Sequence, residues 1–172
     1  PILEEALIEG LKSTGVNIIR VGLGPSPMLY FSVFHLDVDA AVMVTGSHNP
    51  KDQNGFKFML GKRSYFGSDI EFLGEVSSSG EFSSGQGFVE EVSVVESYVG
   101  LLANAWSDYN GSVTSVAWDP GNGAAGEITE MLSRKLPGKH ELINIKVDGT
   151  FPNHHPDPTV PKNMEQLIRT VI

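Results

Sequence analysis

Five consecutive apolar residues, AAVMV at positions 40–44, restrict the fold of this chain more than any other feature. The run is far shorter than a membrane span and lies between Asp39 and the pair Thr45-Gly46. A short, unbroken apolar run with such flanks is typical of a central strand whose two faces are both covered. Helices on both sides of a sheet provide that cover, so the run predicts an α/β fold.

A helix and a βα unit are expected ahead of this run. Leucines recur at helical spacing from residue 3 to residue 11, and Gly15 marks the end of that helix. Residues 17–21 predict a strand, and the turn sequence GPSP then supplies a serine cap for a helix at 26–35.

The segment after the run predicts a hairpin, a helix and a linker. Apolar residues alternate with Lys57 and Met59 in the segment 56–60, GKR turns the chain into a second strand, and a helix is expected at 70–76. Residues 77–87 are rich in Ser and Gly and contain almost no large apolar side chain, which indicates a linker or mobile connection. We therefore place one domain at 1–88 and a second at 89–172.

The second domain contains one βαβ pattern. Its expected elements are a helix at 94–109, a strand at 113–118, a helix ending near 136, a strand at 142–147, a proline-rich loop at 148–161 and a helix at 164–172. The predicted fold class is therefore α/β, with two consecutive α/β domains whose mixed sheets are sandwiched by helices. We expect the second domain to be truncated, because the chain stops within its last helix.

Composition narrows the range of functions. The 172 residues carry a formal net charge of -9, which argues against non-specific binding to nucleic acid or to an anionic membrane surface. A small anionic substrate needs only a few local cations and stays compatible with this charge. The chain has no cysteine, which removes disulfides, thiolate metal sites and cysteine nucleophiles. We expect a cytoplasmic protein with no targeting segment.

The sequence TGSHNP at 45–50 follows the apolar run, at the carboxyl end of the predicted strand, where open α/β sheets bind their ligands. Gly46 and Pro50 favour a sharp loop that presents the hydroxyl of Ser47. His48 and Lys57 supply the proton-transferring and cationic groups that phosphate ester chemistry needs. The pattern differs from the nucleophile elbow Gly-x-Ser-x-Gly, so a hydrolase triad is not expected.

Three segments resemble signatures of the α-D-phosphohexomutases, the phosphomannomutase/phosphoglucomutase family. They are TGSHNP followed by NGFK at 54–57, DPGNGAAG at 119–126 and VDGTFPNHHPDP at 147–158. Ser47 and Lys57 are ten positions apart, as in that family. The likeness covers most of the family's first domain, without its amino-terminal part, and part of its second.

This resemblance implies an isomerase that interconverts hexose 6-phosphate and hexose 1-phosphate of mannose or glucose. Phosphorylated Ser47 is nucleophile, phosphoryl donor and a ligand of Mg²⁺, and hexose 1,6-bisphosphate is the intermediate and activator. His48 and Lys57 are the catalytic candidates for proton transfer and charge stabilisation. Thr45, Gly46, Asn49 and Pro50 are expected to support the loop, with the Asn49 amide as a brace. No residue is assigned to an organic cofactor.

Several family motifs are missing from the chain. The Asp-Gly-Asp-x-Asp-Arg run that completes the metal site is absent from these residues, as are the sugar-binding and distal phosphate-binding segments. We therefore expect the piece alone to be inactive, its partners being hexose phosphates and the missing domains of the same polypeptide. Nothing in these residues selects among mannose, glucose and glucosamine substrates.

Three alternatives remain open. The close relative phosphoglucosamine mutase shares much of the pattern. GNGAAG at 121–126 also satisfies the Gly-x-Gly-x-x-Gly spacing of a dinucleotide site, which would make the chain a non-catalytic nucleotide-binding module. The plainer interpretation is a tight turn that lets a helix pack on its sheet. His154, His155 and Asp157 are candidate metal ligands, although a structural role for these histidines in a proline-rich loop is favoured.

Overall fold

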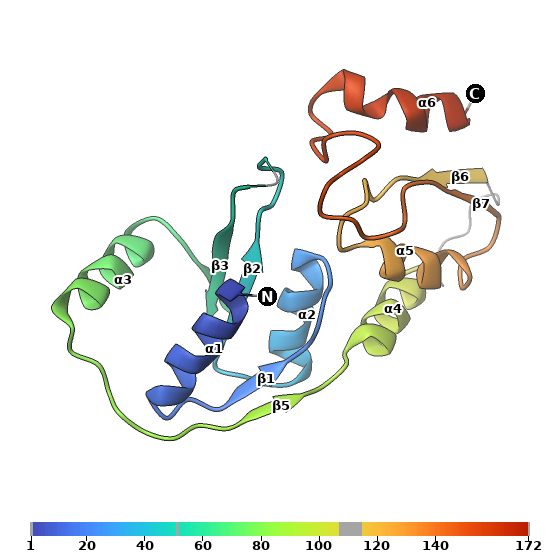
Figure 1. Cartoon of the computed structure of the whole chain (residues 1–172). Helices are drawn as coiled ribbons and strands as arrows, with labels where there is room; N and C mark the ends of the chain where they lie inside the picture. The colour runs from blue at the N-terminus through green and yellow to red at the C-terminus, as the bar shows by residue number, and fades with distance from the viewer. Residues whose placement is uncertain (1, 51, 107–114, 172) are drawn as a thin grey trace. The chain divides into compact units, whose positions relative to one another are not determined.

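The computed structural model describes residues 2–50, 52–106 and 115–171, and its helices and strands form an α/β fold (Figure 1). Two compact units are present. The first unit comprises Pro1–Gly22, Leu29–Thr45 and Gly55–Ser93, and the second comprises Leu23–Met28, Gly46–Asn54 and Val94–Ile172. Parallel and antiparallel strand pairs both occur, so the predicted α/β class with mixed pairing is confirmed. The boundary at 88/89 stays a prediction.

The first unit opens with a helix and a parallel strand pair. Helix α1 is Ile2–Ser13, and Gly15 with a φ of 91° lets the chain turn into strand β1, Ile18–Arg20. Strand β1 pairs in parallel with β5, Val89–Glu91. The expected helix and strand are confirmed, and residues 18–20 of the strand are half-buried.

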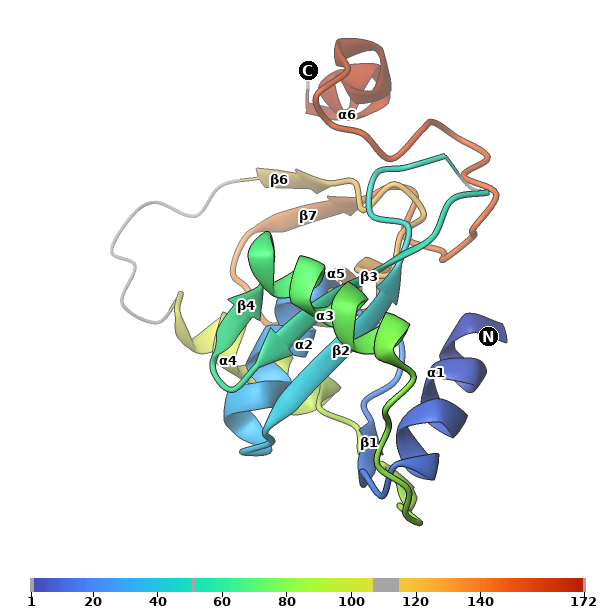
Figure 2. The same cartoon turned by 90° about the vertical axis from the view of Figure 1, so that its left-hand side faces the viewer.

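An antiparallel three-stranded sheet follows (Figure 2). It consists of β2 (Ala40–Thr45), β3 (Gly55–Leu60) and β4 (Arg63–Tyr65), with Ala40 opposite Leu60 and Thr45 opposite Gly55. The predicted strand and hairpin are confirmed. The prediction that β2 is the central strand is wrong for the described sheet: β3 is central, because the turn at Gly61 with a φ of 58° folds β4 back along its other side.

Two further helices flank these strands in sequence. Helix α2 is Ser26–His35, as predicted, and α3 is Ser68–Ser79, which ends at Gly80 in the left-handed region with a φ of 70°. The predicted linker at 77–87 is thus helical in its first three residues.

The rest of that linker is held against the end of α1. The Gly85 and Gly87 amides donate to the Ser13 and Lys12 carbonyls, both at 2.9 Å. A β-carbon on Gly87 would lie 1.9 Å from the Val16 carbonyl oxygen, so only glycine permits this approach. The composition that predicted a mobile connection therefore serves close backbone packing in this segment.

The second unit contains the predicted βαβ unit. Helix α4 is Val95–Asn104, and the parallel strands β6 (Ser115–Trp118) and β7 (Lys139–Leu142) are joined through α5 (Gly126–Ser133). Helix α4 packs against α5, and Val94, Val99 and Ile128 are buried. The predicted ends of the first helix and strand, at 107–109 and 113–114, lie outside the described residues.

The strand predicted at 142–147 is misplaced, because β7 ends at Leu142. Residues 143–147 instead bond to the turn after β6. The Asn122 amide N–H donates to the Asn144 carbonyl at 2.8 Å, and the Asn122 side chain donates to the Lys146 carbonyl at 2.8 Å. Asn144, with a φ of 52°, is in the left-handed region, which breaks the extended geometry that a strand requires.

The described chain ends as predicted, with an irregular segment and a helix. A 3₁₀ helix, Pro161–Met164, leads into α6, Glu165–Val171, which contacts β6. None of the described helices combines the length and the apolar character that crossing a bilayer requires.

Candidate active site

The segment after β2 folds as two consecutive turns in the second unit. The Asn49 amide donates to the Gly46 carbonyl and the Gln53 amide donates to the Pro50 carbonyl, both at 2.9 Å. A β-carbon on Gly46 would lie 2.8 Å from the Gln53 carbonyl oxygen, so the segment closes on itself only with glycine at this position. The turn thus uses the backbone N–H of Asn49, and bracing by its side-chain amide stays a prediction.

Ser47 occupies a strained position in the first of these turns. Its φ is 52°, in the left-handed region that costs an ordinary L-residue about 1–2 kcal/mol. The residue is exposed. Non-glycine residues keep such angles where the surrounding structure enforces them, and these positions concentrate at functional sites. The turn therefore holds Ser47, the serine predicted from the sequence, in a fixed backbone conformation at the surface of the segment.

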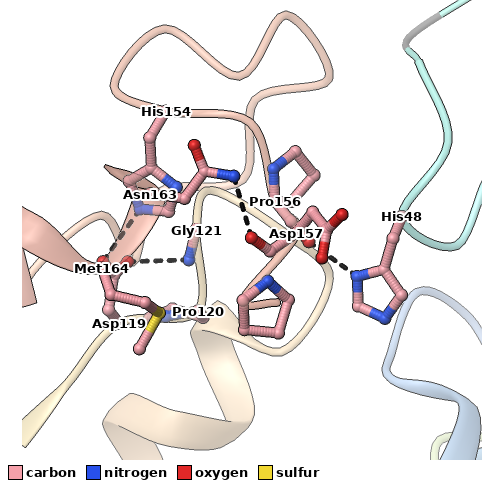
Figure 3. A pocket seen from close by; sticks show the side chains of 10 residues that line it. His48, Asp119, Pro120, Gly121, His154, Pro156, Asp157, Asn163 and Met164 are labelled. Carbon is pink, nitrogen blue, oxygen red and sulfur yellow. Dashed lines mark hydrogen bonds and ion pairs between the residues drawn. The ribbon is translucent and has the colours of Figure 1, made fainter. Parts of the chain in front are cut away.

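His48 is held by a backbone carbonyl that is distant in sequence (Figure 3). The distance from its Nδ1 to the Pro156 carbonyl oxygen is 2.6 Å. A carbonyl oxygen only accepts, so Nδ1 must carry the hydrogen of this bond. In the neutral ring Nε2 is then the nitrogen with the lone pair, and it is the one that can accept a proton from a reacting group.

A pocket of about 200 Å³ lies beside this contact in the second unit. Its lining comes from three segments: the His48 turn, the turn after β6, and the loop and 3₁₀ helix from 154 to 164. The lining residues are His48, Asp119, Pro120, Gly121, His154, Pro156, Asp157, Pro158, Asn163 and Met164.

Asp119 and His154 form a largely buried ion pair in the wall of this pocket. The Asp119 Oδ2 to His154 Nε2 distance is 2.9 Å, and the side chains are 5% and 15% exposed. The other carboxylate oxygen, Oδ1, accepts from the Gly121 amide at 2.9 Å and from the Asn144 amide group at 3.0 Å. Both oxygens of this carboxylate are thus hydrogen-bonded, as a buried charge requires.

Both ring nitrogens of His154 face acceptors, an arrangement that favours the protonated ring. Its Nδ1 lies 3.0 Å from the His155 carbonyl oxygen and its Nε2 lies against the Asp119 carboxylate. Both partners only accept, so both ring nitrogens donate. Burial lowers the pKa of His154, but the bond to the His155 carbonyl and the bond and charge of Asp119 outweigh burial, so this pKa lies above 6.5.

Two further attachments hold the loop that contains His154. Asn153 donates through its side chain to the Asn122 Oδ1 at 2.8 Å, and Asn163 donates to the Asp157 carbonyl at 2.8 Å. The Asp157 carboxylate accepts from the Thr159 hydroxyl at 2.7 Å and from its amide at 2.9 Å. The Thr159 side chain and then its amide lower the pKa of Asp157 despite burial, and the His48 and His155 rings add to the effect.

The glycines of GNGAAG have a packing role. Gly121 has a φ of 58°, and a β-carbon on Gly126 would lie 1.8 Å from the Ile145 carbonyl oxygen. Gly126 is the first residue of α5, so this glycine lets the helix begin directly against the segment after β7. Close packing of the helix, the plainer of the two interpretations, accounts for these glycines.

Metal binding by the histidines is not favoured by their contacts. Both nitrogens of His154 donate hydrogen bonds, which leaves no lone pair for an ion. Within residues 2–50, 52–106 and 115–171, no group of three His, Cys, Asp or Glu side chains gathers as metal ligands would.

Lys57 and Thr45 belong to the first unit, whereas Ser47 belongs to the second. Lys57 lies half-buried in the middle of β3, opposite Met43, and Thr45 is the last residue of β2. The role of Lys57 in charge stabilisation stays a prediction.

Sequence reasoning missed Asp119, Asn163 and the Pro156 carbonyl. The motifs DPGNGAAG and HHPDP contain Asp119 and His154, but a motif does not specify which partners these side chains find in the fold. The available signal was the position of Asp119 directly after the first strand of the βαβ unit. That position lies at the carboxyl edge of the parallel strands, where the loop after the second strand also begins. The contact of a backbone carbonyl with His48 has no counterpart in sequence pattern.

Comparison with known families identifies two segments. Residues 1–71 match the family described as phosphoglucomutase/phosphomannomutase, alpha/beta/alpha domain I, and residues 96–172 match domain II of the same description.

Individual relatives agree with these matches. A phosphomannomutase/phosphoglucomutase of Pseudomonas putida is 39% identical over 99% of the chain, and a phosphoglucomutase of Neisseria meningitidis is 38% identical over 98%. A crystal structure of a phosphoglucomutase/phosphomannomutase family protein from Burkholderia thailandensis superposes with a TM-score of 0.88 at 35% identity, covering 98% of this chain and 38% of that one. The chain spans 36% of the length of the two curated relatives.

Proposed function

The chain belongs to the phosphoglucomutase/phosphomannomutase family of hexose phosphate mutases, and on this premise we propose that Ser47 is the residue that carries the transferred phosphoryl group. The observation that supports this role most directly is the enforced turn at Ser47, with its φ of 52° and the tight closure at Gly46. A serine in this position presents its hydroxyl from a fixed backbone.

The proposed reaction has two balanced transfers. In the first, the bond from phosphorus to Ser47 Oγ breaks and a bond to a hydroxyl oxygen of the hexose monophosphate forms. That hydroxyl gives up its proton, and Ser47 Oγ takes one up. The product is a hexose 1,6-bisphosphate. After the bisphosphate turns around, the bond between its other phosphorus and the sugar oxygen breaks and a bond to Ser47 Oγ forms. The serine hydroxyl gives up its proton, and the sugar oxygen left behind takes one up.

Within this scheme His48 is the group that moves the proton. Its Nδ1 is occupied by the Pro156 carbonyl, so Nε2 exchanges the proton with the reacting hydroxyl. Lys57 is proposed to stabilise charge on the phosphoryl group through its ammonium. Phosphoryl transfer depends mainly on such positioning and charge stabilisation, because the protein has little covalent chemistry to perform.

Magnesium would reduce the charge that develops on the phosphoryl group. The described residues offer it only the phosphorylated Ser47, because no three metal-ligating side chains gather within them. We therefore propose that its aspartate ligands lie in residues other than these, and that the 172-residue chain alone does not turn over.

The substrate is proposed to be a mannose or glucose phosphate. The relatives with the same pattern carry the names phosphomannomutase/phosphoglucomutase and phosphoglucomutase. Glucosamine phosphate is the alternative, since the residues that choose the sugar are not among the signatures found in this chain.

The test is phosphoryl labelling of Ser47. The longest natural polypeptide that contains this sequence is incubated with hexose 1,6-bisphosphate labelled in its phosphates and with Mg²⁺, and its peptides are mapped by mass spectrometry. We expect the label on Ser47 and its loss in Ser47→Ala. Ser64→Ala, which removes a serine of β4 in the first unit, is the matched control and should label normally. Absence of label from Ser47 in a polypeptide that contains the aspartate-rich metal motif would contradict the proposal.

A further inference from the structure

The loop at 154–157 is fixed on both sides of the carbonyl that contacts His48. On one side, the His154 ring is paired with Asp119 at 2.9 Å (Figure 3). On the other, the Asp157 carbonyl accepts from Asn163 at 2.8 Å and the Asp157 carboxylate accepts from Thr159. Pro156 lies between the two attachments, and its ring limits φ to a narrow range.

The peptide groups around Pro156 are also bonded within the loop. The Asp157 amide donates to the His155 carbonyl at 2.8 Å, and the same carbonyl accepts from His154 Nδ1 at 3.0 Å. The direction of the Pro156 carbonyl is thus set by neighbours that are themselves held in place. The His154 ring bonds to the His155 carbonyl through one nitrogen and to Asp119 through the other. It therefore links the turn after β6 to the Pro156 carbonyl.

We propose that Asp119 and His154 are positioning residues for the phosphoserine loop. They hold the Pro156 carbonyl where it selects the Nδ1–H tautomer of His48 and so keeps Nε2 as the proton-exchanging nitrogen. This inference rests on the proposed role of Ser47 and His48, and it adds a second pair of residues through which that site is organised.

A stabilising role alone accounts poorly for this arrangement. A buried ion pair is often no better for stability than apolar residues of similar volume, because removing two charges from water is costly. Buried pairs are best attested where they fix one of several alternative arrangements. Here the alternatives are the two tautomers of His48, and the tautomer is set by the partner of the opposite nitrogen.

The tautomer of His48 provides a direct test in the full polypeptide. With the histidines labelled with ¹⁵N, long-range ¹H–¹⁵N correlation spectra at about pH 7.5, one unit above the ordinary imidazole pKa, distinguish Nδ1–H from Nε2–H. We expect Nδ1–H for the neutral His48 ring of the natural protein. In His154→Leu the donor to Asp119 is lost, and the proton should move to Nε2.

Three variants separate positioning from general damage to the fold. His154→Gln keeps an N–H donor for Asp119 and should restore the Nδ1–H signal. Asp119→Asn removes the charge with little change of shape and should weaken the Nδ1–H signal of His48. This variant keeps the test decisive if His154→Leu does not fold. His35→Gln makes the same substitution in an exposed histidine of α2, outside this loop, and should leave the signal unchanged.

Kinetics gives the second measurement. The rate constant for phosphoryl transfer between Ser47 and hexose phosphate should fall by about tenfold to a hundredfold in His154→Leu, with KM little changed, since misplacement of a catalytic group by about 1 Å has effects of this size. His154→Gln should recover most of the rate, and His35→Gln should retain all of it.

The outcomes are distinguishable. An Nε2–H tautomer in the natural protein, or an Nδ1–H signal that persists in folded His154→Leu and Asp119→Asn, would overturn the inference. An Nδ1–H signal that responds as expected, in a protein whose Ser47 never takes up phosphate, would support the geometric link and contradict the proposed function on which its catalytic meaning rests.

Discussion

The two units hold their charged side chains in opposite ways. In the first unit Arg20 lies 2.9 Å from both Glu4 and Glu91, and Arg63 lies 2.7 Å from Asp69, but the arginines are 39% and 60% exposed. In the second unit the Asp119–His154 pair has side chains that are only 5% and 15% exposed. Solvent weakens the ion pairs of the first unit. In the Asp119–His154 pair, hydrogen bonds and the opposite charge must offset the cost of removing both groups from water.

The difference follows from how the backbone is satisfied in each unit. Five strands of the first unit pair in ladders, which satisfy much of its backbone. The surface ion pairs of this unit are therefore not needed to hold its backbone in place. In the second unit, residues 143–160 contain no described helix or strand, and their polar groups bond to side chains such as Asn122 and Asp119. Irregular backbone next to the candidate site is thus held by buried polar side chains.

The largest expected effect comes from breaking the buried pair. Asp119→Ala leaves the His154 cation without its carboxylate and removes the acceptor of the Gly121 and Asn144 donors, so we expect the free energy of unfolding to fall by about 3–5 kcal/mol. Urea unfolding followed by circular dichroism measures it. The matched change in the first unit, Asp69→Ala, should cost no more than about 1 kcal/mol because its partner Arg63 is exposed. Similar losses in both variants would remove the contrast between the units.

A glycine substitution tests the packing of the irregular segment. Gly126→Ala places a β-carbon 1.8 Å from the Ile145 carbonyl oxygen, and we expect the resulting shift of helix or loop to cost about 1–3 kcal/mol. Gly74→Ala in α3 is the control, since no atom lies within 4 Å of its added β-carbon. Replacement of this helical glycine should stabilise by about 0.5–1 kcal/mol. A neutral Gly126→Ala would show that the loop moves freely.

The smallest effect concerns pH. The pKa of His154 is raised in the folded protein, so its protonated form contributes stability that is fully present below the unfolded pKa of about 6.5 and is lost as the pH rises through the folded pKa. Asp119 faces its ring directly, and His48 and Asp157 line the same pocket. The difference in unfolding free energy between the natural protein and His154→Gln should therefore shrink above neutral pH in a urea series. A constant difference would show that His154 is not a cation.

The sequence predicted most of the regular structure and the centre of the candidate site. Leucine spacing located α1, alternation located the β3–β4 hairpin, and TGSHNP identified the turn that holds Ser47. These features depend on neighbours within a few residues. The prediction was wrong where contacts distant in sequence decide: residues 143–147 are apolar enough for a strand, yet their carbonyls accept from Asn122.

By itself the sequence determined the α/β class and the family, because periodicity and short motifs record local geometry and local chemistry. It also supplied Ser47 as the proposed phosphoryl carrier. Only the tertiary structure decided that Gly85 and Gly87 pack on α1, that Asp119 pairs with His154, and that the Pro156 carbonyl occupies one nitrogen of His48. Each of these contacts joins groups that are distant in sequence and meet only when the chain is folded. No pattern along the chain specifies that before the chain is folded.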